Sequence, residues 1–182
     1  MLRFLFLVAY LFALSSFTFS QEKVRKTETI STASKLVLAK LNSADIKGTA
    51  VFTLASANDD GTLLGNLVYS LPETERQKIA QSLNKSLAEI PPSLTANNLT
   101  VSFQKNTHCP DIRLEFAELD LELSGTRLHL NRFVLGFTET PQKLSRALCI
   151  WTDRTNKGIS NKGIVQYINL LLKGEEDEEQ PK

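Results

Sequence analysis

Residues 111–137 read DIRLEFAELDLELSGTRLHLNRFVLGF, and apolar and polar side chains alternate along two arms of this segment. Alternation with a period of two is typical of a β-strand that buries one face. The arms meet at Ser124-Gly125, a dipeptide suited to a two-residue turn. With the turn there, the apolar residues of the two arms lie opposite one another, as in Leu121 and Leu128. The segment therefore predicts a long antiparallel hairpin.

The apolar positions of this hairpin change parity halfway along each arm. On the first arm they are odd-numbered close to the turn and even-numbered further out, and on the second arm the order is reversed. Both changes fall at the same height, at 117–118 and 131–132. Because a shift of one residue moves side chains to the opposite face or marks a bulge, we expect a bend or paired bulges there. A curled hairpin would allow arms of roughly 40 Å, at about 3.3 Å per residue, to be buried.

Turn and helix signals elsewhere predict an α+β fold. Pro72 begins a helix over 72–89, and Pro91-Pro92 ends it. Gly174 closes a C-terminal helix over 164–173. Strands are expected at 48–56, 62–71 and 98–104, whereas 35–41 suits a short helix or a strand and 141–152 suits a helix or a buried strand. The predicted order is ββαβββ followed by a helix, a curved antiparallel sheet packed on a helix.

The start of the chain has the pattern of a signal peptide. Arg3 precedes eleven consecutive apolar residues at 4–14, and small residues near position 20 offer a cleavage site before Gln21. A membrane span needs about 20 apolar residues, which favours a cleaved leader over an uncleaved anchor. We expect a secreted or periplasmic protein with no transmembrane span after cleavage. Its parts are a signal peptide at 1–20, a polar linker or frayed first strand at 21–34, a single α+β domain at 35–174 and an acidic disordered tail at 175–182.

The chain has two cysteines, Cys109 and Cys149. In an oxidising compartment we expect them to form one disulfide, which contributes about 3–4 kcal/mol on the chain-entropy model. One alternative is a reactive thiol beside His108. Another is a zinc site made by His108, Cys109 and His129, which would break the disulfide. The disulfide is favoured, and we predict neither a metal nor another cofactor.

The charge balance gives no support to a nucleic-acid partner. Removing residues 1–20 takes one basic residue from totals of 21 basic and 20 acidic, so the remainder is neutral. Five acidic residues lie at 175–179, and the segment 127–173 carries eight basic against two acidic residues. Nucleic-acid binding usually needs a stronger cluster of basic residues on one face.

No motif in the sequence identifies a family or a catalytic centre, since GxSxG, HExxH, CxxC, GxGxxG and Walker patterns are absent from it. The weak catalytic candidates are Asp120 and His129, which face each other on the proposed hairpin and could act as an acid–base pair. A solvated face with cross-strand ion pairs, each contributing roughly a few tenths of a kcal/mol, explains them better. Trp151 with Arg146 and Arg154 could form an exposed recognition patch, although a lone Trp beside a disulfide is more often part of the core.

The lack of a catalytic motif, together with a set of apolar residues that could exceed what a core requires, indicates an exported, non-enzymatic binding module. The concave face of the curled sheet could hold an apolar or lipid-like ligand, or an apolar segment of a partner protein. The side chains expected to line that face are Phe103, Leu114, Phe116, Phe133, Leu135 and Phe137. Two alternatives stay open: a secreted hydrolase that uses Asp120 and His129, and a structural envelope protein that binds partners through the basic segment 127–173.

Overall fold

A computed structural model describes residues 30–105, 107, 109–137 and 142–174. The predicted signal peptide and acidic tail lie outside these residues. The described part is α+β, with an eight-stranded antiparallel sheet and three α-helices. In chain order the elements are β1 (Lys35–Leu41), β2 (Ala44–Ala57), β3 (Thr62–Ser70), α2 (Glu73–Leu83), the short 3-10 helix η1 (Leu87–Glu89), β4 (Ser93–Phe103), β5 (Arg113–Phe116), β6 (Leu119–Leu123), β7 (Thr126–Leu130), β8 (Phe133–Gly136), α3 (Gln142–Asn156) and α4 (Lys162–Lys173).

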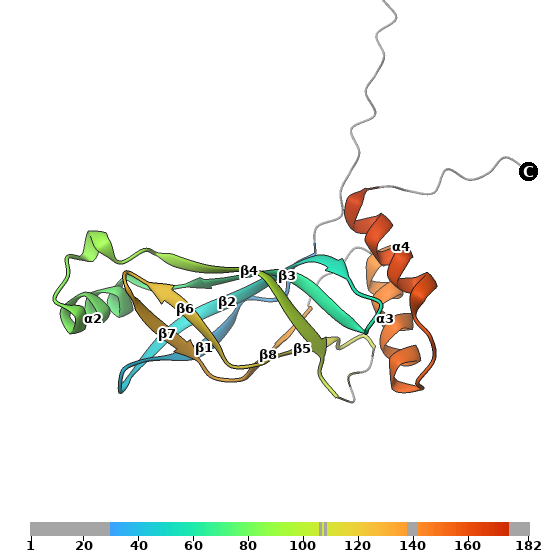
Figure 1. The fold of residues 1–182 in the computed structure, drawn as a ribbon, viewed down its shortest axis with the longest axis horizontal. Helices are drawn as coiled ribbons and strands as arrows, with labels where there is room; N and C mark the ends of the chain where they lie inside the picture. Colours follow the sequence, from blue (N-terminus) through green and yellow to red (C-terminus); the bar gives the residue numbers. More distant parts are fainter. Residues whose placement is uncertain (1–29, 106, 108, 138–141, 175–182) are drawn as a thin grey trace, which may run out of the picture.

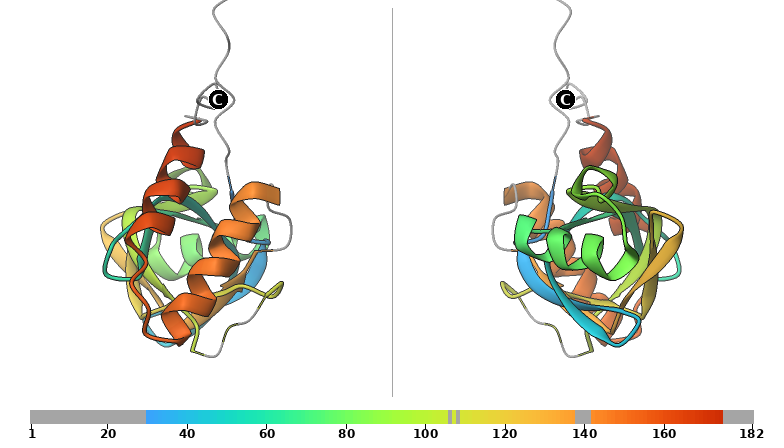
Figure 2. Two further views of the ribbon diagram at one scale, coloured as in Figure 1. Left: turned by 90° about the vertical axis from the view of Figure 1, so that its right-hand side faces the viewer. Right: turned by 90° about the vertical axis from the view of Figure 1, so that its left-hand side faces the viewer.

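The sheet is curled, and the predicted hairpin joins its two sides (Figure 1). The strand order is β6-β7-β1-β2-β3-β4-β5-β8. The first arm of the hairpin is divided into β5 and β6, and the second arm is divided into β7 and β8. β5 pairs with β4, whereas β7 pairs with β1. The arms of one hairpin therefore reach both sides of the sheet, and the Ala33 N–H donates a hydrogen bond to the Gly136 carbonyl of β8 at 2.9 Å. Seen along its long axis, the sheet forms a ring of strands (Figure 2).

The hairpin bends where the sequence predicts it. The gaps between β5 and β6 and between β7 and β8 fall at 117–118 and 131–132. The register of both strand pairs agrees with the predicted pairing. Ser124 and Gly125 have φ values of 50° and 83°, the positive values that a tight two-residue hairpin turn requires. The antiparallel hairpin and the curl of the sheet are confirmed.

Apolar side chains from alternating strand residues fill the inside of the curled sheet, and burial alternates along β2 and β3. Tyr69 of β3 is fully buried, and its hydroxyl donates a hydrogen bond to the Val37 carbonyl at 2.9 Å. Gly48 of β2 leaves room for this ring, because a Cβ atom there would lie 2.3 Å from Cζ of Tyr69. Register shifts after Leu54 and after Gly65 add to the curvature.

Helices lie at both ends of the curled sheet (Figures 1 and 2). α2 is at the end that contains the hairpin turn, where the Ser124 hydroxyl donates to the Glu89 carbonyl at 2.7 Å. α3 and α4 lie side by side at the opposite end. The predicted disulfide between Cys109 and Cys149 is confirmed, and it ties α3 to the loop that enters β5. Among the described residues, no helix is both long enough and apolar enough to cross a membrane.

The helix expected over 72–89 is shorter than predicted. α2 ends at Leu83, where Asn84 takes a left-handed conformation with φ of 52°. Ser86 then starts η1, with its side chain and backbone both bonded to the Glu89 carboxylate. This capping box competes with continuation of the helix, so the chain turns before it reaches the two prolines. α2 lies at the end of the sheet (Figure 1), and the core is made largely of side chains from the strands themselves, so the sheet does not wrap around this helix as predicted.

Two segments that the sequence left open are assigned by the structure. Residues 35–41 form β1, and the segment predicted at 141–152 as a helix or a strand contributes to α3. The observed order thus has one more strand before α2 and one more helix at the end than the predicted order, and it has five strands rather than three after α2 because each arm of the hairpin is divided in two. Residues 30–33, expected in a linker or a frayed strand, pack on the sheet: Ile30 is fully buried and Ser31 bridges to β2.

Candidate functional site

The six apolar residues predicted to line a ligand site belong to the hydrophobic core or pack against it. Phe116 stacks on Phe133 with ring centroids 4.7 Å apart and meets Phe52 edge to face at 5.3 Å. Phe103 packs edge to face against Trp151 at 5.1 Å. The other three are buried: Leu114, Leu135 and Phe137. Each of the six thus has a packing role, and the binding of an apolar ligand by them stays a prediction.

Asp120 and His129 lie opposite each other on β6 and β7, as the sequence predicts. Oδ1 of Asp120 is 2.8 Å from Nδ1 of His129, and Oδ2 is 3.9 Å from the Arg127 guanidinium. The side chains of Asp120 and His129 are 45% and 41% exposed. Acid–base pairs in active sites are usually tuned by burial, so this exposure favours surface polar contacts that each contribute roughly 0–1 kcal/mol.

The two cysteines are bonded to each other, with their Cα atoms 5.5 Å apart. Cys109 therefore offers no thiolate to the alternatives of a reactive thiol or a zinc site. His108, another member of the zinc set considered from the sequence, lies outside the described residues.

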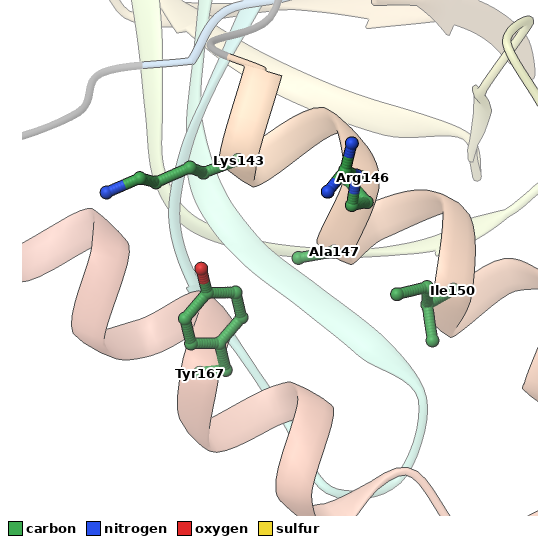
Figure 3. Close-up of a pocket in the computed structure, with 5 residues that line it drawn as sticks. All are labelled: Lys143, Arg146, Ala147, Ile150 and Tyr167. Carbon is green, nitrogen blue, oxygen red and sulfur yellow. The ribbon is translucent and has the colours of Figure 1, made fainter. Parts of the chain in front are cut away.

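A pocket of about 160 Å³ opens between α3 and α4 (Figure 3). One side of α3 carries Leu144, Leu148 and Trp151 and is buried against the core. The pocket lies on the other side of this helix, and α4 supplies its opposite wall. Its lining residues are Lys143, Arg146, Ala147, Ile150 and Tyr167.

The lining combines apolar walls with positive charge. Ile150 and Tyr167 are 44% and 37% exposed. Among the described residues they are two of five large apolar side chains that are exposed; the others are Leu36, Leu38 and Ile159. The Tyr167 hydroxyl points from α4 toward the first turns of α3, where Lys143 and Arg146 stand at the rim (Figure 3). The pocket can therefore take an apolar group that has an anionic neighbour.

Contacts outside the pocket hold both of its walls in place. On α4, the Asn169 amide donates to the Ala57 carbonyl at 2.9 Å and accepts from the Ala57 N–H at 2.8 Å. On α3, Cys149 forms the disulfide, and Arg154 donates two hydrogen bonds to the Ser160 carbonyl in the loop that leads to α4. A pocket with fixed walls loses little conformational entropy when it binds.

Sequence reasoning named Arg146 only in the less favoured interpretation, an exposed patch with Trp151 and Arg154. Trp151 is fully buried, which confirms the favoured interpretation that it belongs to the core. The available signal for the pocket was the spacing of Lys143, Ala147 and Ile150, which places them on one side of a helix at i, i+4 and i+7. That spacing does not reveal which residue of α4 faces them.

Two further pockets have a different character. One lies between β1 and β8, where Lys35 donates to the Val134 carbonyl at 2.9 Å and Arg113 is paired with Asp111. The other lies beside the disulfide and is lined by threonine, aspartate and asparagine side chains as well as by the cysteines. Neither of them contains the exposed large apolar side chains that mark the α3–α4 pocket.

Comparison with known proteins adds no assignment to this geometry. No protein-family model, curated protein or solved structure matches the chain.

Proposed function

We propose that the protein is an exported, non-enzymatic binding module that holds a segment of a partner protein in the α3–α4 pocket. The observation that carries this proposal is the pairing of two exposed apolar side chains, Ile150 and Tyr167, across a pocket whose walls are fixed. Exposed apolar surface with a polar rim is a common feature of sites that bind proteins or ligands. Export is supported by the leader-like residues 1–20 and by the disulfide, which persists in oxidising compartments.

The size of the pocket favours a protein partner over a small-molecule ligand. Its volume is about 160 Å³. Sites for small molecules usually measure about 300–1,000 Å³, whereas a cavity of about 150 Å³ accommodates a benzene ring. The pocket therefore suits one aromatic or branched aliphatic side chain of a longer segment, which is how a binding hot spot is commonly filled.

The charge around the pocket favours an acidic segment. Residues 142–173 contain six basic side chains and one acidic side chain. Two of the basic side chains, Lys143 and Arg146, line the pocket itself. Acidic residues beside the apolar anchor of the partner would meet these cations at the rim, which improves specificity and association rate more than affinity.

The other functions considered from the sequence have less support. A carrier of lipid-like ligands would need space beside Phe116 and Phe133, whose rings are stacked on each other. A hydrolase would need Asp120 and His129 in a sheltered site, and both are open to water. A structural envelope protein that binds partners through the basic segment 127–173 would be compatible with the α3–α4 pocket, which lies within that segment.

Selection of peptides from a displayed random library tests this proposal. We expect the peptides that bind the protein to share one large apolar residue flanked by acidic residues. Replacing the apolar wall by a carboxylate, Ile150→Asp, should weaken their binding by about thirtyfold or more, which corresponds to the roughly 2 kcal/mol of a hot spot. Fluorescence anisotropy with a labelled peptide measures this change.

The chain offers a matched control for that variant. Ile159 is 46% exposed, close to the 44% of Ile150, and does not line the pocket. Ile159→Asp therefore introduces the same charge at a similar exposure and should leave the affinity within about twofold. Selected peptides that bind the two variants equally well, or a selection that yields no peptide, would contradict the proposal.

A further inference from the structure

The outer face of the sheet carries aliphatic side chains on β1, β2 and β3. Leu36 and Leu38 of β1 point outward, because the residues that alternate with them are buried. They are 60% and 47% exposed, and among the described residues Leu36 is the most exposed large apolar side chain. Val51 of β2 and Val68 of β3 lie opposite each other at outward positions of their strands. We call these four residues the outer aliphatic patch.

Two exposed lysines lie beside this patch. Lys47 is directly opposite Leu38 in the register of β1 and β2, and Lys40 is the next outward residue of β1 after Leu38. The one carboxylate on these strands, Asp45, lies opposite Lys40. β1, β2 and β3 together contain three basic residues and one acidic residue, so this part of the sheet is positively charged. The acidic residues of β6 lie beyond β7, which separates them from β1.

The shape of this face suits a flat, deformable surface. The patch lies on the outside of a curled sheet, so its side chains project from a convex surface (Figure 2). None of its four residues lines any of the three pockets described above. A concave pocket encloses a group of its ligand between walls, whereas a convex patch places its own side chains into the partner. A lipid bilayer accepts side chains in this way.

We propose that the outer aliphatic patch binds the surface of a membrane that contains anionic lipids. Leu36 and Leu38 enter the boundary between headgroups and acyl chains, and Lys40 and Lys47 lie at the lipid phosphates. A second copy fits this face less well, because a two-fold contact would bring two positively charged faces together. The patch lies on the strands, whereas the α3–α4 pocket lies at the helical end of the sheet (Figure 1), so this inference does not depend on the proposed function.

The expected binding is reversible. A lysine beside an anionic bilayer strengthens binding by about fivefold. Burying the exposed part of a leucine side chain contributes a similar factor, since about half of each leucine is already covered in the folded protein. Two leucines and two lysines therefore give weak binding that depends on salt, and not a permanent anchor.

Co-sedimentation with vesicles tests this inference on the exported form expected from the sequence, which begins at Gln21. We expect binding to vesicles of equal parts phosphatidylglycerol and phosphatidylcholine at about 0.1 M salt. Binding should be much weaker at about 1 M salt, where the screening length is about 3 Å, and with phosphatidylcholine alone. Leu38→Gln and Lys47→Gln should each weaken binding by about fivefold.

The chain offers a matched control for the leucine variant. Ile159 is 46% exposed, close to the 47% of Leu38, and lies between α3 and α4. Ile159→Gln should therefore leave vesicle binding within about twofold of the parent protein. Urea unfolding shows whether each variant is folded, and Leu36→Gln takes the place of Leu38→Gln if that variant is not.

Several results would overturn the inference. One is the absence of sedimentation with the anionic vesicles at about 0.1 M salt, and another is equal sedimentation with neutral vesicles. A loss with Ile159→Gln as large as that with Leu38→Gln would assign the membrane contact to the helical end. Self-association that Leu38→Gln abolishes, in a protein that binds no vesicles, would assign the patch to a second copy.

Discussion

Replacing Phe116 by alanine should destabilise the protein by about 4 kcal/mol. Phe116 is 1% exposed, stacks on Phe133 at 4.7 Å and meets Phe52 edge to face at 5.3 Å. Truncating a buried phenylalanine to alanine usually costs about 3–5 kcal/mol. Each aromatic contact adds about 0.5–1.5 kcal/mol to the contribution of the buried area. The expected loss therefore lies in the middle of the range of about 3–5 kcal/mol or above it.

Urea unfolding with the disulfide intact measures this loss. With a slope of about 2 kcal/mol per molar urea, a destabilisation of about 4 kcal/mol lowers the midpoint by about 2 M. Leu38→Ala is the control, because Leu38 lies on the outer face of β1 and is 47% exposed. A surface substitution of this kind changes the unfolding free energy by less than about 0.5 kcal/mol.

A small effect of Phe116→Ala would refute the reasoning. If the ring lined an open ligand site in the sheet, its removal would break few packing contacts. The loss in the free energy of unfolding should then be below about 1.5 kcal/mol. That result would contradict a packed interior and would favour the carrier function predicted from the sequence. An effect near 4 kcal/mol would leave the surface of the protein as the place for binding.

Three other predictions address parts of the fold. Gly48→Ala should cost about 1–3 kcal/mol in urea unfolding, because the new methyl group would overlap the ring of Tyr69, and an unchanged midpoint would be inconsistent with that contact. Cys149→Ser should cost about 4 kcal/mol, the chain-entropy value for closing a loop of this length, and a melting temperature equal to that of the oxidised protein would refute it. The pKa of Glu75 is held below its ordinary value by a hydrogen bond from Lys78 and one from a backbone N–H, against the opposing effect of burial. Its ionised form thus stabilises the fold above the unfolded-state pKa of about 4.3, and this contribution is lost as the pH falls through the lower folded-state pKa. Glu75→Gln should therefore be less stable than the parent protein at pH 7, with a difference that shrinks toward pH 3, and a difference independent of pH would show that the charge has no such role.

The long hairpin could be predicted from the sequence because its information is local. A period of two fixes which side chains share a face, and the turn at Ser124-Gly125 fixes which residues pair. The parity change at 117–118 and 131–132 even located the bend. The sequence could not predict which strands pair with the outer sides of the hairpin. β5 pairs with β4 and β7 pairs with β1, and these pairings join segments far apart in the chain.

β1 and α2 show where local patterns fail. In β1, Leu36 and Leu38 lie on the exposed outer face while Val37 is buried, so the alternation that marks a strand is hidden by apolar residues on both sides. In α2, the apolar spacing continues past Leu83, but the left-handed Asn84 ends the helix before the prolines. Tertiary packing thus decides the conformation of β1. The end of α2 is set locally, by Asn84 and by the capping box of Ser86 and Glu89.

The candidate site was the least predictable part. The hydrophobic residues expected to bind a ligand belong to the core or pack against it, and an alternating pattern reports burial without distinguishing a packed interior from a binding cavity. The α3–α4 pocket depends on how two helices lie against each other, and its wall residue Tyr167 belongs to a helix that was expected at 164–173 without any role in a site.

The most direct measurement of the proposed function is methyl NMR of the protein labelled at isoleucine and titrated with a selected peptide. If a partner side chain enters the α3–α4 pocket, the methyl signal of Ile150 shifts and saturates with the peptide, while that of Ile159 stays in place. If Ile150 does not respond and buried isoleucines such as Ile46 and Ile112 do, binding takes place inside the sheet, and the proposed site is wrong.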